Sequence, residues 1–111
     1  MRFYKYLYTD ESIKNIDKIK MRLKLHRGNP DVFVICISQG NDQLDIINAS
    51  FFKQKIYRKY PPIIVGLSKS KEGAVSLVAK MIEESLAKTG NALIKDYLIL
   101  KAKTKNFSIE N

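Results

Sequence analysis

The sequence predicts an α/β protein, with a single four-stranded sheet and three helices in the order β-α-β-α-β-α-β. Two uninterrupted apolar runs, 32–37 and 63–65, are rich in β-branched residues, which is typical of strands buried on both faces. Residues 74–85 instead repeat their apolar side chains at helical spacing. This alternation of strand-like and helix-like segments favours one sheet with helices packed on it.

The N-terminal segment predicts a strand followed by a helix. Residues 2–8 alternate aromatic and basic side chains, which suits a peripheral strand with one wetter face. Thr9 and Asp10 are suitable N-cap residues for a helix that runs to about Leu25. The buried stripe of this helix is predicted to contain Ile13, Ile16, Ile19 or Lys20, and Leu23.

The middle of the chain predicts a central strand and then an ambiguous segment. Residues 31–38 read as the strand. In residues 44–53, the spacing of Leu44, Ile47 and Phe51 favours a short helix, whereas the adjacent isoleucines favour a strand. With a helix here, the two central strands are expected to be parallel. With a strand, a ferredoxin-like βαββαβ arrangement becomes the alternative.

The C-terminal part predicts a strand, a helix and a last strand. Pro61 and Pro62 direct the chain into the strand at 63–65. The stripe of the following helix is predicted to be Ala74, Leu77, Val78, Met81, Ile82 and Ser85. Gly90 suits the left-handed position after this helix. Residues 93–102 predict an edge strand, and the tail 103–111 either extends it or is disordered.

Composition describes one basic domain, residues 1–111. No apolar run reaches the roughly 18 residues of a membrane span, and no signal peptide is recognised, so a cytoplasmic location is predicted. The single cysteine, Cys36, lies in an apolar run and is interpreted as a buried, unreactive thiol. The net charge of +9 comes mostly from Lys spread along the chain; it favours an anionic partner, although solvated lysines would give the same total.

The turn after the strand at 63–65 is the first candidate site. It places glycines, hydroxyls and lysines at a helix N-terminus, where free backbone N–H groups and the helix dipole favour an anion. The residues predicted to bind a phosphate or carboxylate are Gly66, Ser68, Lys69, Ser70, Lys71 and Gly73. Their spacing is neither that of a dinucleotide loop nor that of a P-loop, and capping by Ser68 or Ser70 explains the same residues.

A basic and aromatic surface is the second candidate. Basic groups can follow a phosphate backbone while aromatic rings stack on bases. The residues predicted to form this surface are Lys53, Lys55, Tyr57, Arg58, Lys59 and Tyr60, joined by Lys14, Lys18 and Arg22 if the helices share a side. Rings that fill gaps under solvated charges would give the same pattern, and no RNP signature, KH loop or helix-turn-helix spacing is present.

The sequence favours a domain that is not an enzyme. The single histidine, His26, ends a basic helix and has no acidic partner near it in sequence, and capping explains Asp42 and Asp45. No His/Cys spacing predicts a metal, and no cofactor is predicted. A structural protein is a further class, because edge strands at 3–8 and 97–100 are able to pair across a homodimer.

The segment DQLDIINASFFKQKIYRKYPPIIVGLSKSKEGAVSLV resembles a pattern in small, uncharacterised bacterial proteins. In that pattern a Leu-Asp/Glu-Ile run, a Gln, tyrosines, and an Ile-Val-Gly strand with a Gly/Glu/Ala helix start occur together. The resemblance implies a bacterial, cytosolic, stand-alone domain and brings no known activity. It marks Asp45, Gln54, Tyr57 and Gly66 as positions for mutagenesis.

The predicted function is a small binding or accessory domain that uses a basic surface on an anionic partner, either nucleic acid or an acidic protein. One alternative is a small-ligand domain that holds a phosphate or carboxylate at the 66–73 turn. The other is a homo-oligomeric structural protein.

Overall fold

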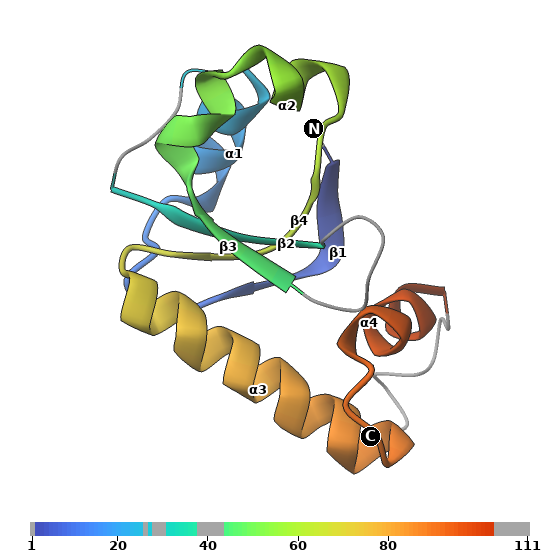
Figure 1. Ribbon diagram of the computed structural model, residues 1–111. Helices are drawn as coiled ribbons and strands as arrows, with labels where there is room; N and C mark the ends of the chain where they lie inside the picture. Colours follow the sequence, from blue (N-terminus) through green and yellow to red (C-terminus); the bar gives the residue numbers. More distant parts are fainter. Residues whose placement is uncertain (1, 26, 28–30, 38–43, 104–111) are drawn as a thin grey trace.

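A four-stranded mixed sheet runs through the protein, with helices on both of its faces (Figure 1). The computed structural model describes residues 2–25, 27, 31–37 and 44–103. In chain order the elements are β1 (Arg2–Thr9), α1 (Ile16–Lys24), β2 (Phe33–Ile37), β3 (Leu44–Asn48), the 3₁₀ helix η1 (Ala49–Lys53), α2 (Lys55–Lys59), β4 (Ile63–Ser68), α3 (Lys71–Thr89) and α4 (Ile94–Lys103).

Three of the four strands point in the same direction. The strand order is β1-β4-β2-β3; β1 is parallel to β4, whereas β2 is antiparallel to both β4 and β3. The final residues of β1, β4 and β3 therefore lie at one edge of the sheet, which we call the carboxyl edge. Phe33, the first residue of β2, lies at this edge as well, because it pairs with Ser68 and with Asn48.

Each face of the sheet has its own hydrophobic core, because successive strand residues point to opposite faces. The core under α1 and η1 contains Ile13, Ile19, Leu23, Val32, Val34, Ala49, Phe52, Ile64 and Leu67. The core under α3 and α4 contains Tyr4, Ile35, Val65, Ala74, Leu77, Met81, Ile94, Tyr97 and Leu98. The molecule thus has three layers, with α1 and α2 on one side of the sheet and α3 and α4 on the other (Figure 1).

Several predictions are confirmed. The class is α/β with a single four-stranded sheet, and three of the described helices, α1, α3 and α4, are longer than a turn or two. The two apolar runs form the adjacent central strands β2 and β4, and β1 is an edge strand. Ser70 caps α3 by accepting a hydrogen bond from the backbone N–H of Gly73 at 2.9 Å, and Gly90 ends the helix with a φ of 78°.

Two segments form a different element from the one predicted. Residues 44–48 form strand β3 and not a helix, because the β-branched pair there lies in a five-residue antiparallel ladder with β2. Residues 94–103 form helix α4 and not a strand. Ile94, Tyr97 and Leu98 bury themselves at helical spacing, and the surrounding Leu, Lys and Ala residues favour a helix. Residues 97–100 therefore do not supply an edge strand for a homodimer.

Other corrections follow from the topology. The central strands are antiparallel, and through β4 the elements follow the order β-α-β-β-α-β of the ferredoxin-like alternative. The sheet itself is not ferredoxin-like, because the order β1-β4-β2-β3 places β1 and β3 at its edges, whereas a ferredoxin-like sheet has them at its centre. β4 continues through Gly66, where an added Cβ would lie 2.8 Å from Ile35 Cδ1, so this glycine lies in the sheet and not in the turn. Helix α1 begins later than predicted, with Asn15 and not Asp10 as its N-cap. His26, Asp42 and residues 104–111 lie outside the described residues.

Candidate functional site

Positive charge is concentrated on one helical layer of the protein. α1, η1 and α2, on one face of the sheet, carry eight Lys and Arg against a single acidic residue, Asp17, for a net charge of +7. α3 and α4, on the other face, are longer but carry six Lys against four acidic residues, for a net charge of +2. Each layer carries six lysines, so the difference in net charge comes from two arginines in the first layer and from three additional acidic residues in the second. We call α1, η1 and α2 the basic layer.

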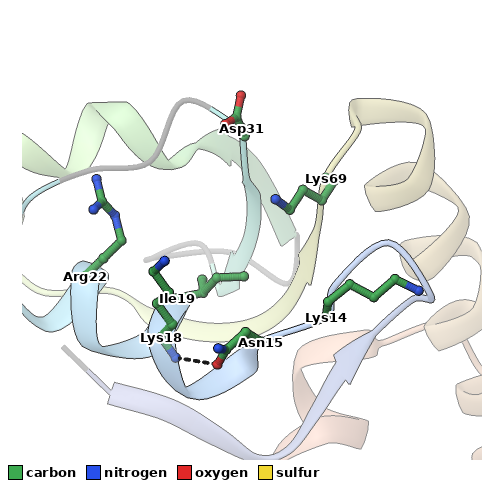
Figure 2. Close-up of a pocket in the computed structure, with 7 residues that line it drawn as sticks. All are labelled: Lys14, Asn15, Lys18, Ile19, Arg22, Asp31 and Lys69. Atoms are coloured by element: carbon green, nitrogen blue, oxygen red, sulfur yellow. Dashed lines mark hydrogen bonds between the residues drawn. The ribbon is translucent and has the colours of Figure 1, made fainter.

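A hollow of about 420 Å³ opens where the basic layer meets the carboxyl edge (Figure 2). It is lined by Lys14, Asn15, Lys18, Ile19, Arg22, Asp31 and Lys69. Four of these side chains are cationic and one is a carboxylate. The fold thus joins residues from two separately predicted candidates, the row beginning at Lys14 and the turn that contains Lys69. We call this the basic hollow.

Helix α1 positions the basic hollow's central pair of cations. Lys18 and Arg22 are four residues apart, about 6 Å along the helix axis, and Asn15 fixes the helix start by accepting a hydrogen bond from the Lys18 N–H at 3.1 Å. Figure 2 shows Lys69 reaching from the turn toward α1, while the ammonium group of Lys14 points away. Because Lys14 precedes the N-cap, only two members of the predicted row share the helix.

The turn between β4 and α3 is held by a carboxylate that follows β1. Asp10 accepts hydrogen bonds from Ser68 Oγ at 2.6 Å, from the Ser12 N–H at 3.0 Å and from the Ser12 hydroxyl. Ser12 Oγ in turn accepts a hydrogen bond from the backbone N–H of Lys69 at 3.0 Å. Burial acts to raise the pKa of Asp10, but these hydrogen bonds outweigh it and lower the pKa. The backbone that carries Lys69 is therefore tied to the first strand.

This arrangement decides what the 66–73 turn presents to solvent. Gly66 is buried in the sheet, and Ser68 is 0% exposed and hydrogen-bonded to Asp10. A Cβ on Gly73 would lie 2.6 Å from Asp10 Oδ2, so this carboxylate sits beside the first turn of α3. An external anion at that helix N-terminus would meet the negative charge already there. The exposed residues of the turn are Lys69, Ser70, Lys71 and the acidic Glu72.

Two further hollows adjoin each other along β3 and α2. The larger, of about 420 Å³, is lined by Phe33, Ile46, Ile47, Asn48, Phe51, Tyr57 and Lys71. The smaller, of about 270 Å³, is lined by Cys36, Ile37, Asp45, Ile47, Ile56, Tyr57, Tyr60 and Pro62. Ile47 and Tyr57 belong to both, so the two spaces are neighbours. We call them the aromatic hollows.

In the predicted basic and aromatic segment, residues 53–60, some side chains line these hollows and the others face solvent. Tyr57 is half-buried, with its ring edge-on to that of Phe52 at a centroid distance of 4.9 Å. Phe51 and Tyr60 are 51% and 53% exposed. The cations of η1 and α2 all face solvent; they are Lys53, Lys55, Arg58 and Lys59. Exposed rings therefore stand beside exposed cations.

A polar cluster on the opposite side was not predicted. Glu84 of α3 accepts hydrogen bonds from Tyr8 Oη at 2.9 Å, from Tyr97 Oη at 2.9 Å and from Lys101 Nζ at 2.9 Å. Burial and the bond to the carboxylate raise the pKa of both tyrosines. Burial opposes ionisation of Glu84, but the three donors outweigh it and lower its pKa. At neutral pH the two tyrosines remain phenols and Glu84 remains a carboxylate. The cluster ties α4 to β1 and α3.

The other kinds of reactive group that the described residues could form are a metal-ligand cluster and a reactive cysteine. Among the residues that the structure describes, no three or more His, Cys, Asp or Glu side chains are placed to hold a metal ion. Cys36 is buried, and burial, with a smaller contribution from Asp45, raises its pKa to about 12. The burial of Cys36 is confirmed, and a buried thiol with a raised pKa is predicted to be unreactive.

Comparisons with known proteins identify no relative of this chain. Neither a protein-family model, nor a curated protein, nor a solved structure matches this chain. Within the described ranges, none of the helices is both long and apolar enough to cross a lipid bilayer. The function must therefore be argued from the site itself.

Proposed function

We propose that the protein binds nucleic acid by its phosphate backbone, through the basic layer and the basic hollow. The observation that carries the proposal is the separation of charge, a net +7 on α1, η1 and α2 against +2 on α3 and α4. A surface of one sign attracts a polyanion, and each Lys or Arg that replaces a counterion adds to the affinity.

The placement of the cations favours a polyanion over a single small anion. Lys18 and Arg22 are aligned along α1, and Lys69 approaches from the β4–α3 turn. Four more cations belong to η1 and α2, and α2 lies on the same side of the sheet as α1. A regularly charged backbone can contact all of them in turn, whereas one phosphate group reaches only the basic hollow. The exposed rings beside α2 favour nucleic acid over an acidic protein, because bases supply faces on which they stack.

A small anionic ligand in the basic hollow is the second candidate. It is favoured by the concave shape, about 420 Å³, and by the convergence of Lys18, Arg22 and Lys69. Inorganic phosphate or pyrophosphate at low concentration would then compete fully with an oligonucleotide. Competition only at concentrations that act as general salt supports the polyanion.

The test is fluorescence anisotropy of a labelled oligonucleotide of about 20 nucleotides, titrated between about 50 and 200 mM salt. The variant replaces Lys18, Lys55 and Lys69, three exposed lysines of the basic hollow and the basic layer, by Gln. If all three contact phosphates, the slope of log K against log salt for a single strand should become shallower by about 2. Affinity at low salt should fall at least tenfold.

The matched control replaces Lys80, Lys88 and Lys103, three exposed lysines of α3 and α4, by Gln. It has the same net charge as the first variant and should keep most of the affinity and the slope. Equal losses in the two variants would reduce the effect to net charge and overturn the proposal. Absence of binding by the native protein at low salt, or equally tight binding of polyglutamate, would overturn it as well.

A further inference from the structure

The larger aromatic hollow lies at the same edge of the sheet as the basic hollow. The smaller one adjoins it through Ile47 and Tyr57 and extends toward the opposite edge, where β2 ends and β3 and β4 begin. Lys69 lines the basic hollow and Lys71 lines the larger aromatic hollow. Because consecutive Cα atoms are about 3.8 Å apart, the Cα atoms of these two lysines are at most about 7.6 Å apart. Phe33 and Asn48, which pair at the carboxyl edge, also line the aromatic hollow. One extended ligand can therefore enter both spaces.

The walls of the aromatic hollows suit flat, unpaired bases. Phe33, Phe51 and Tyr57 contribute rings to the larger space, and Tyr57 and Tyr60 to the smaller. Phe51 and Tyr60 are about half exposed, at 51% and 53%, so their faces can be reached from solvent. Stacking of a base on such a ring is favourable for every base, because each has a π-face.

Charge around these hollows matches a phosphate backbone. η1 and α2 carry four cations and no acidic residue, and Lys71 stands at the other side. Among the residues that the structure describes, Asp45 is the one carboxylate that lines either aromatic hollow, and it is exposed at the far end, in the smaller space. Rings that line a hollow, with cations near them, are an arrangement that binds single strands without reading their sequence.

We propose that the protein selects single-stranded nucleic acid, whose unpaired bases stack in the aromatic hollows on Phe51, Tyr57 and Tyr60 while the backbone follows the basic layer. This inference rests on the proposed function and adds the class of ligand. A duplex keeps its bases stacked and paired, so it can use the cations but not the rings. The single strand should therefore bind more tightly than a duplex of the same length.

The experiment compares three labelled ligands of equal length: a single-stranded oligonucleotide, its duplex, and a strand with abasic positions. The variant is Phe51→Ala with Tyr60→Ala, which changes exposed rings only. Its control is Leu86→Ala with Leu100→Ala, exposed apolar residues of α3 and α4. The ring variant should lose at least about fivefold in single-strand affinity for each ring removed. Its affinities for the duplex and the abasic strand should change by less than about twofold.

The outcomes distinguish failure of single-strand selection from failure of the proposed backbone binding. If no ligand binds even at low salt, the proposed function fails and this inference fails with it. If all three ligands bind with equal affinity and the ring variant behaves as its control does, backbone binding stands and single-strand selection is overturned. Loss of binding to phosphatidylserine vesicles in the ring variant, with oligonucleotide binding unchanged, would assign the rings to a membrane surface and would also overturn it.

Discussion

Replacing Glu84 by Gln tests whether the polar cluster holds α4 onto the sheet. Glu84 lies on α3 and accepts hydrogen bonds from Tyr8 of β1 and from Tyr97 and Lys101 of α4. Its side chain is 27% exposed and that of Lys101 is 13% exposed, so water can replace only part of what is lost. Gln keeps the size of the side chain and one acceptor oxygen, but removes the negative charge that all three donors share.

The expected loss is about 2 kcal/mol in the free energy of unfolding. Hydrogen bonds to a charged group are worth about 1.5–3 kcal/mol each when one partner is removed. Breaking a fully buried ion pair costs about 3–5 kcal/mol, and the partial exposure here places the value below that range. With an unfolding entropy of about 2.1 cal/mol/K per residue over 111 residues, each kcal/mol shifts Tm by about 4 °C. The variant should therefore melt about 8 °C lower.

Thermal and urea denaturation followed by circular dichroism measure this difference. Glu83→Gln is the matched control, because it removes the same charge from the neighbouring, exposed position of α3. The cluster has no stabilising role if Glu84→Gln lowers Tm by no more than this control does. A similar shift in both variants would assign the effect to the charge of the helix.

The pH dependence of stability is a second test of the contribution of Glu84. The pKa of Glu84 is lowered from its ordinary value of 4.5 in the folded state. A carboxyl with a lowered folded pKa stabilises the protein fully above its unfolded pKa and loses that contribution as pH falls through the folded pKa. The difference between the native protein and Glu84→Gln should thus be largest at neutral pH and shrink below about pH 4.5.

Two further changes probe the packing around the site. At an ordinary helical position, replacing Gly by Ala stabilises a protein by about 0.5–1 kcal/mol. Gly73→Ala should instead reduce the free energy of unfolding by about 1–2 kcal/mol and so lower the urea midpoint. The added Cβ would lie 2.2 Å from Ser68 Oγ and 2.6 Å from Asp10 Oδ2, and an unchanged or raised midpoint would contradict this geometry. Cys36, with its pKa raised to about 12, should not react with a thiol reagent at pH 8 until urea unfolds the protein; rapid reaction of the folded protein would refute its burial.

The buried elements could be predicted because their patterns have one physical explanation. The apolar runs of β2 and β4 occupy central strands, where Val34 and Ile35, or Ile64 and Val65, fill opposite cores. Helix α3 has a regular stripe, a serine N-cap and a glycine at its end, and these signals agree with one another.

The two misassigned segments are those whose type is decided by distant contacts. β3 is a strand because β2 offers five backbone partners, which the residues 44–48 do not reveal on their own. α4 is a helix because Tyr97 and Leu98 pack on β1 and α3, where Tyr4 Oη donates to the Leu98 carbonyl at 2.7 Å. A short apolar run without such information fits either element.

The direction of β2 explains why the two candidate sites seemed separate in the sequence. Because β2 is antiparallel to β4, it begins where β4 ends, and it brings Asp31 and Phe33 next to Lys69 and Lys71. A strand β2 parallel to β4 would place its first residues at the opposite edge, and neither hollow could form from these residues. Reading 44–53 as a helix implied that parallel arrangement. The same error that changed one element type therefore separated the turn that contains Lys69 and Lys71 from the basic and aromatic surface, although the carboxyl edge places residues of both together.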